Sequence, residues 1–176
     1  MNTPPSAERV WDPFVRVFHW SLVSTVVLNQ WVLEEGERPH RWLGYAAAAL
    51  VLLRVVWGFI GPRYARFSDF WPTPTRLRHH LRAWFRGDEM HVPGHNPLGA
   101  LMMLALMLLV LLLGLTGWLQ GTDRFWGNEA LREAHESLAD GLIGLAGLHA
   151  AAAIVMGRLE RTRLVKAMVT GVKERY

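Results

Sequence analysis

The chain has 176 residues, 51% of them hydrophobic, and a formal net charge of +4. This length suits one domain, and the hydrophobic content with 9 Trp is typical of a membrane protein rather than a soluble one. The sequence contains no cysteine, which excludes disulfides, thiolate-ligated clusters and c-type haem attachment, and leaves histidine as the main available metal ligand. The first residues lack the pattern of a cleavable signal peptide, so the first hydrophobic segment is expected to stay in the protein.

Four hydrophobic stretches are long enough to cross a bilayer, at residues 14–33, 41–60, 97–119 and 135–157. The third has no charged residue and follows Asn96, which predicts an N-cap with Pro97 at the first helical position. The polar, arginine-rich connection 62–94 contains a predicted amphipathic surface helix at residues 75–85. The sequence thus predicts one domain over residues 1–176, an all-α integral membrane protein built as a four-transmembrane-helix bundle.

Lysine and arginine residues set the predicted orientation. Fourteen of them lie in the N-terminal tail, the connection 62–94 and the C-terminal tail, whereas four lie in the connections 34–41 and 120–134. The excess of basic residues on the cytoplasmic side of membrane proteins then places both termini in the cytoplasm. Topology and attraction to the inner leaflet account for the basic balance, so no nucleic-acid partner is predicted.

Four histidines sort into two layers of the predicted bundle. His40 and His135 lie at the starts of the second and fourth predicted helices, near the outer surface, and His19 and His149 lie on the cytoplasmic side. Each layer then has two imidazoles from different helices, which is the requirement for a haem b with two axial histidines. The predicted pairs are His19 with His149 for the inner iron and His40 with His135 for the outer iron. A single membrane histidine can instead serve as a proton-relay or hydrogen-bonding residue, but four at matched depths favour two haems.

Three arginines are candidates for contact with haem propionates. Arg54 follows His40 by 14 residues, which places it on the same side of its helix at the depth of the inner layer. A buried guanidinium is costly without an anion, and a propionate would supply one. Arg16 and Arg158 are further candidates, and for Arg158 the alternative is that the side chain extends to lipid phosphates.

A fifth histidine leaves the ligand set open. His95 lies directly before the third predicted helix, where it is a candidate to bind a propionate or a quinone, to replace His19 as an inner ligand, or to be a surface histidine. Three other histidines lie in the polar connection and are expected to be solvated: His79, His80 and His91.

Several motifs follow one another along nearly the whole chain: VWDPFVRVFHWSLV, HRWLGY, RVVWGFIGPRYARFSDFW, GHNPLGALMM with LTGW, and HESLAD with GLHAAAA. In this order they resemble the bacterial cytochrome b561 family, on the branch that contains the b-type cytochrome subunit of nickel-iron hydrogenases. The resemblance implies four transmembrane helices in the bacterial inner membrane and two haems b. Matched by motif, the ligands fall on His19, His40, His135 and His149.

The sequence carries no nucleophile triad, phosphate loop or dense carboxylate cluster, so no catalytic residue is predicted. The expected function is electron transfer between the membrane quinone pool and a periplasmic redox partner, a cytochrome c or a hydrogenase-like enzyme. One alternative is a self-contained superoxide:quinone oxidoreductase, which the mildly acidic outer connections count against, and another is a haemless helical scaffold. The expected partners are membrane lipid, quinone or quinol and a periplasmic redox protein, and a homodimer is left open.

Overall fold

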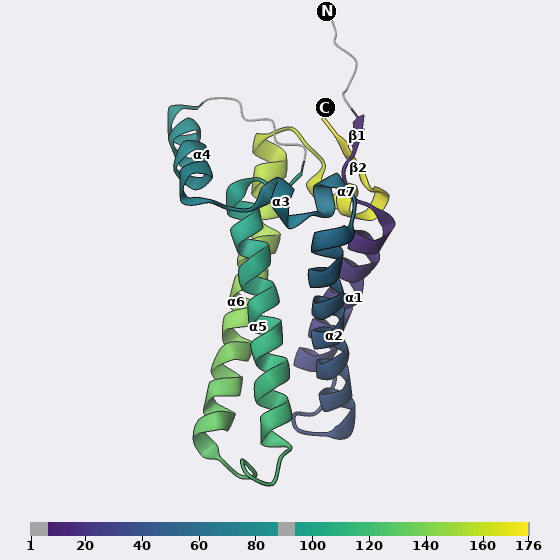
Figure 1. Cartoon of the computed structure of the whole chain (residues 1–176), viewed down its shortest axis with the longest axis vertical. Helices are drawn as coiled ribbons and strands as arrows, with labels where there is room; N and C mark the ends of the chain where they lie inside the picture. Colours follow the sequence, from purple (N-terminus) through teal and green to yellow (C-terminus); the bar gives the residue numbers. More distant parts are fainter. Residues whose placement is uncertain (1–6, 88–93, 176) are drawn as a thin grey trace, which may run out of the picture. The chain divides into compact units, whose positions relative to one another are not determined.

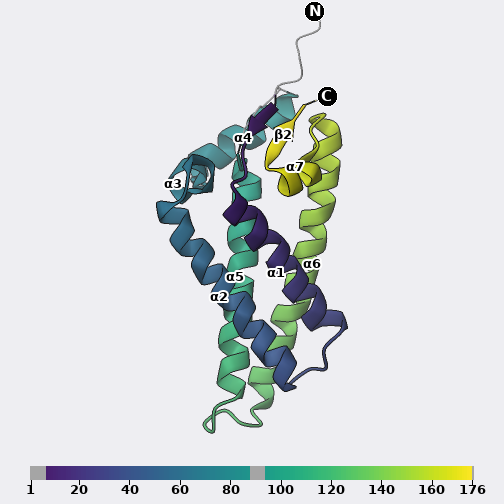
Figure 2. The same cartoon turned by 90° about the vertical axis from the view of Figure 1, so that its right-hand side faces the viewer.

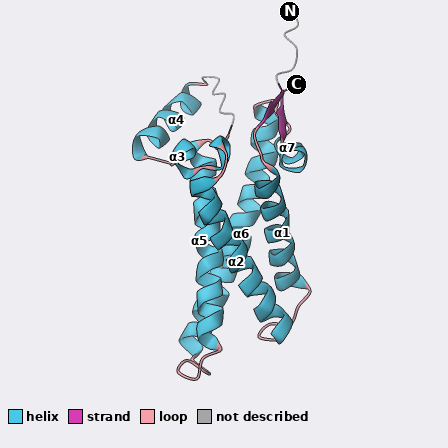
Figure 3. Cartoon of the chain, turned by 45° about the vertical axis from the view of Figure 1, so that its right-hand side comes forward, coloured by secondary structure: helices cyan, strands magenta, loops and turns pink. Residues whose placement is uncertain are grey.

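The computed structural model describes residues 7–87 and 94–175. Expectations for the first six residues, for residues 88–93 of the basic connection and for His91 lie outside the described residues. The described chain is mostly helical, with one two-stranded ribbon (Figure 3). Its elements in chain order are β1 (Ala7–Arg9), α1 (Pro13–Trp31), α2 (Arg38–Ile60), the 3₁₀ helix η1 (Arg63–Ala65), α3 (Phe67–Phe70), α4 (Pro74–Arg86), α5 (Pro97–Gln120), α6 (Glu129–Leu159), α7 (Leu164–Thr170) and β2 (Val172–Glu174).

Three of the described helices are long and apolar enough to cross a membrane, namely α2, α5 and α6. The prediction of an all-α membrane protein therefore fits, apart from the short ribbon, which was not predicted. The first predicted span corresponds to α1, which has 19 residues and is not among the three. The reason is composition, because α1 carries polar side chains along its length, including His19, Thr25 and Asn29.

Helix starts follow their capping residues. The predicted N-cap Asn96 is confirmed, since its Oδ1 accepts a hydrogen bond from the Gly99 N–H at 2.7 Å. The start predicted for the last long helix is wrong, because α6 begins nearly two turns before His135. There Asn128 accepts from the Leu131 N–H at 3.0 Å, and the charged first turns of α6 lack the hydrophobicity on which the prediction relied. His135 therefore lies in the second turn of α6.

The basic connection folds into short helices, of which α4 confirms the predicted amphipathic helix. Thr73 caps α4 by accepting from the Arg76 N–H at 3.2 Å, and Gly87 ends it in the left-handed conformation, with φ at 73°. The expectation that His79 and His80 are both solvated is wrong for His80. His79 is exposed, whereas His80 is only 7% exposed on the buried face of α4.

The described chain divides into two compact units. The cavity unit comprises Val17–Val56 and Ala105–Gly147, and the ribbon unit comprises the described residues within Met1–Arg16, Trp57–Leu104 and Leu148–Tyr176. In the ribbon unit, β1 pairs antiparallel with β2 next to α7 (Figures 1 and 2). Arg16 connects α1 to α7, because its Nη1 donates a hydrogen bond to the carbonyl of Thr170 at 2.7 Å. The two ends of the described chain thus stabilise each other.

Small residues bring the helices of the cavity unit together. A Cβ added at Gly114 of α5 would lie 2.8 Å from the Cβ of Ala48 of α2, closer than side chains tolerate. A Cβ added at Gly44 of α2 would lie 3.6 Å from Nδ2 of Asn29 of α1, an ordinary contact. Close approach at small residues is the usual way in which membrane helices gain packing energy.

Candidate cofactor site

The cavity unit contains a partly open cavity of about 960 Å³. This volume lies at the upper end of the range for ligand pockets and suits a large group. Segments of α1, α2, α5 and α6 line it, with His40 and His135 among the lining residues and glycines at positions 44, 114 and 117. Glycine in the wall lets a flat group come close to the backbone.

Two imidazoles project toward the same cavity from different helices. The ring centroids of His40 and His135 are 6.5 Å apart. An imidazole–metal bond of about 2.0 Å and a ring radius of about 1.1 Å would place the centroids of two opposed ligands about 6.2 Å apart. The observed separation therefore fits one metal ion held between the two rings.

Two buried polar atoms in the cavity wall support this interpretation. Among the residues that the structure describes, Nδ1 of His40 and Oδ1 of Asn29 have no hydrogen-bond partner. Buried polar groups in folded proteins are nearly always satisfied, so two such atoms around one cavity indicate a site that is completed by a bound group. The two imidazoles and the cavity volume fit a haem.

His135 is held by contacts from α5 that were not predicted from the sequence. Oγ1 of Thr116 lies 2.7 Å from its Nδ1, and a Cβ added at Gly117 would lie 3.3 Å from its Cε1. Both neighbours belong to the motif LTGW, which was noted only as part of the family pattern. Predicting the contact between Thr116 and His135 requires knowing how α5 and α6 are aligned along their lengths. The predicted start of α6 was wrong, so this alignment could not be predicted.

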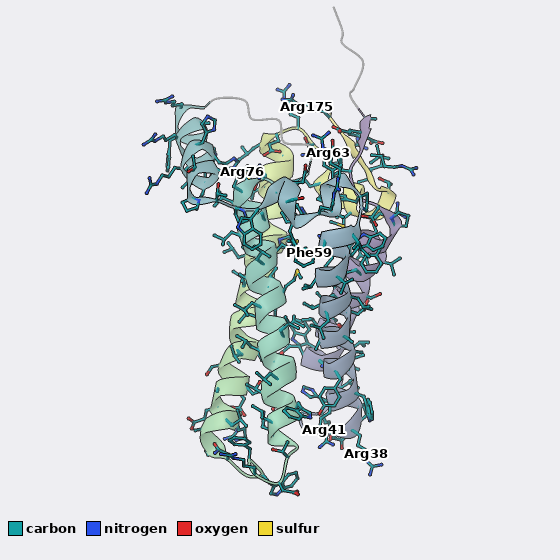
Figure 4. All side chains as sticks on the ribbon, viewed as in Figure 1. Arg38, Arg41, Phe59, Arg63, Arg76 and Arg175 are labelled. Carbon is teal, nitrogen blue, oxygen red and sulfur yellow. The ribbon has the colours of Figure 1, made fainter. Side chains whose placement is uncertain are left out.

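Charged side chains lie around one end of the cavity. Arg132 pairs with both Glu129 and Glu136 in the first turns of α6. Arg41, counted in the sequence only for orientation, also lines the cavity, and Figure 4 places it near the start of α2. The acidic character predicted for this end is thus partly neutralised.

The inner pair of histidines is divided between the two units. His19 lies on α1 in the cavity unit and His149 on α6 in the ribbon unit, and both are half-buried. The pairing of His19 with His149 therefore stays a prediction.

The three predicted propionate arginines have different surroundings. Arg54 is the largest fully buried side chain among the described residues and is 1% exposed. Arg16 uses one of its five donors on Thr170, which leaves donors for an anion. Arg158, at the end of α6, is exposed, which is consistent with either of its predicted roles.

His95 lies between two aromatic rings of the ribbon unit. Its centroid is 4.7 Å from that of Trp11 and 4.8 Å from that of Phe70. It is therefore packed in the protein, and the prediction of a surface histidine is not supported, although its predicted contact with a propionate or a quinone stays untested.

Burial also shifts two titratable groups of the ribbon unit. Desolvation lowers the pKa of His80 and the pKa of Lys173, and the nearby Glu160 carboxylate partly opposes both shifts. Tyr64 donates a hydrogen bond to Glu8, which raises the pKa of the phenol. These groups lie outside the candidate site.

Apolar helices of membrane-spanning length, with two neighbouring imidazoles on a large cavity, are the features of a membrane protein with room for a metal-containing prosthetic group. A family model described as prokaryotic cytochrome b561 matches residues 10–171, so the chain belongs to this family. The resemblance found in the motifs is confirmed. The protein is a membrane b-type cytochrome of electron transfer, and the family implies that it binds haem b. No curated protein and no solved structure matches the chain.

Proposed function

We propose that the protein carries two haems b and passes electrons between the membrane quinone pool and a periplasmic redox partner, such as a cytochrome c or a hydrogenase-like enzyme. The observation that carries this proposal is the His40–His135 pair, with ring centroids 6.5 Å apart on one cavity. Membership of the cytochrome b561 family supports the electron-transfer role. Haem b, when bound, supplies reversible one-electron chemistry.

The chain's own residues hold and tune the two cofactors. His40 and His135 are the proposed ligands of the outer haem, and His19 and His149 those of the inner haem. The proposed partners of the propionates are Arg16, Arg54 and Arg158. His95, held between aromatic rings, is the proposed donor to an inner propionate or to a quinone.

The proposed topology has four spans in the bacterial inner membrane, formed by α1, α2, α5 and α6, with both termini in the cytoplasm. The distribution of lysine and arginine supports it, because the connections before α2 and before α6 are poor in both. The His40–His135 pair then lies toward the periplasm, where a soluble redox protein would dock.

The test is anaerobic stopped-flow spectroscopy on the purified protein. A short-chain quinol is mixed in first, and a soluble c-type cytochrome is then added as the acceptor. The parent is expected to accept electrons from the quinol at both haems and to pass them to the acceptor. His135→Ala, which removes one outer ligand, should still be reduced at the remaining haem but lose transfer to the acceptor. Transfer at the parent rate in this variant would contradict the proposal.

The superoxide:quinone alternative makes a different prediction in the same apparatus. It requires superoxide to reduce the haems and quinone to reoxidise them. Carboxylates outnumber arginines along the cavity, which disfavours an anionic substrate: the lining includes Glu35, Glu129, Glu136 and Asp140 against Arg41 and Arg132. Rapid reduction by superoxide with no transfer to the c-type cytochrome would favour the alternative.

A further inference from the structure

The contact between Thr116 and His135 gives a role to the motif LTGW, whose residues have no part in the proposed function. Thr116 lies on α5, and its Oγ1 is 2.7 Å from Nδ1 of His135 on α6. The same oxygen is 2.8 Å from the carbonyl oxygen of Leu112, one turn earlier in α5. The hydroxyl thus has an imidazole nitrogen on one side and a backbone carbonyl on the other.

Proton counting selects one arrangement of these three groups. A hydroxyl has one proton to donate, and a carbonyl oxygen can only accept. If the Thr116 proton goes to the carbonyl of Leu112, as is common for threonine in helices, Oγ1 accepts from His135. The Nδ1 of His135 then carries the proton, and Nε2 keeps its lone pair.

A lone pair on Nε2 is what a metal ligand needs. Histidines that bind metals nearly always donate their other ring N–H to an oxygen, which fixes the tautomer and the ring orientation and strengthens electron donation through the ligating nitrogen. Gly117 adds a steric element, since a Cβ there would lie 3.3 Å from Cε1 of His135. Consecutive residues of α5 therefore set the tautomer and leave room for the ring.

We propose that Thr116 is a positioning residue that fixes His135 as an Nε2 ligand by accepting a hydrogen bond from its Nδ1. This inference rests on the proposed outer haem. Thr116 does not itself touch the iron, and its effect passes through the imidazole of His135. Removing the hydroxyl should weaken the electron donation from this imidazole to the iron. The oxidised state of the iron should then be less stable relative to the reduced state.

The experiment compares four forms of the holoprotein: the parent, Thr116→Val, Thr116→Ser and Thr122→Val. Valine keeps the shape of threonine without the hydroxyl, and serine keeps the hydroxyl. Thr122 is the matched control, because its hydroxyl also donates to a helix carbonyl, that of Leu119 at 2.6 Å, and it is not among the described residues that line the cavity.

Two readouts apply, the midpoint potential of each haem and the rate at which each haem is lost to a haem-scavenging protein. In Thr116→Val the outer haem should shift to a more positive potential and be lost about 10-fold to 100-fold faster, in line with the fall in metal affinity that removal of an outer-shell partner causes. The inner haem should keep its parent values. Thr116→Ser and Thr122→Val should match the parent at both haems.

The outcomes separate this inference from the proposed function. Two haems in the parent, with an unchanged outer potential and loss rate in Thr116→Val, contradict the role of Thr116 alone. Equal changes in Thr116→Ser and Thr116→Val also contradict it, because packing and not the hydroxyl would then be responsible. Fewer than two haems in the parent contradict the proposed function, and the inference falls with it.

Discussion

The segments of the cavity unit and those of the ribbon unit are held together in different ways. In the ribbon unit, side chains reach partners far along the chain, as in the bonds of Arg16 to Thr170 and of Tyr64 to Glu8. In the cavity unit, helices meet at small residues around a large cavity, and the wall holds buried polar atoms with no partner among the described residues, such as Nδ1 of His40. The ribbon unit has such an atom too, Nε of Arg16, so the difference lies in how the segments are held together. A unit that is incomplete by itself depends on what it binds, and we therefore expect bound haem to stabilise the cavity unit more than the ribbon unit.

The largest expected effect comes from removing an outer ligand. His40→Ala and His135→Ala should each abolish the same redox component, because either change leaves one imidazole where two are needed. The other component should remain in both variants. Potentiometric titration of the haem absorbance measures this. If the two variants lose different components, the assignment of His40 and His135 to one haem is wrong.

Removing an inner ligand should have a similar effect on the other component. His19→Ala and His149→Ala are expected to abolish one common component and to leave the one that depends on His40 and His135. The same titration decides the result. If His95→Ala, and not His19→Ala, removes the component that His149→Ala removes, His95 is the inner ligand.

A smaller effect is expected from Arg54→Leu. Arg54 is 1% exposed, so its charge acts through a poorly screened medium. In such a medium a unit charge contributes on the order of 1 kcal/mol or more to the energy of a nearby charge, so we expect a shift of tens of millivolts. Loss of this positive charge should lower the potential of the inner haem. An unchanged potential with full occupancy would mean that Arg54 serves packing or lipid contact.

Gly117→Ala should disturb the outer haem modestly. The new Cβ would lie 3.3 Å from Cε1 of His135, so the ring must move by a few tenths of an ångström. We expect a shift in the low-spin electron paramagnetic resonance signal of the outer haem. Gly144→Ala is the matched control, since no described atom beyond its own stretch of α6 lies within 4 Å of the Cβ it would add. Equal spectra for the parent and both variants would contradict the close contact.

The smallest effect should fall in the ribbon unit, at His80. Burial lowers the pKa of this imidazole below its ordinary value of 6.5, so at acid pH the unfolded segment binds a proton that the folded one resists. The packing of α4 should therefore weaken as the pH falls through about 6.5. Hydrogen exchange of α4 at pH 7.5 and 5.5 measures this, with His79→Gln as the exposed control and His80→Gln expected to reduce the pH dependence. Equal pH dependence in the parent and His80→Gln would contradict it.

Much of this organisation could be predicted from the sequence, because hydrophobic length and capping residues act locally. Asn96 and the amphipathic segment around His80 were located from their neighbours in the chain. What could not be predicted depends on contacts between distant residues. The ribbon forms by backbone pairing between segments near the two ends of the chain. The position of His135 depends on its contact with Thr116, which is 19 residues away on another helix.

The most direct test of the central claim is the haem content of the purified protein. Pyridine haemochrome analysis after full reconstitution should give two haems b per chain and no covalently attached haem, since the chain has no cysteine and has two predicted histidine pairs. One haem or fewer per chain would contradict the account.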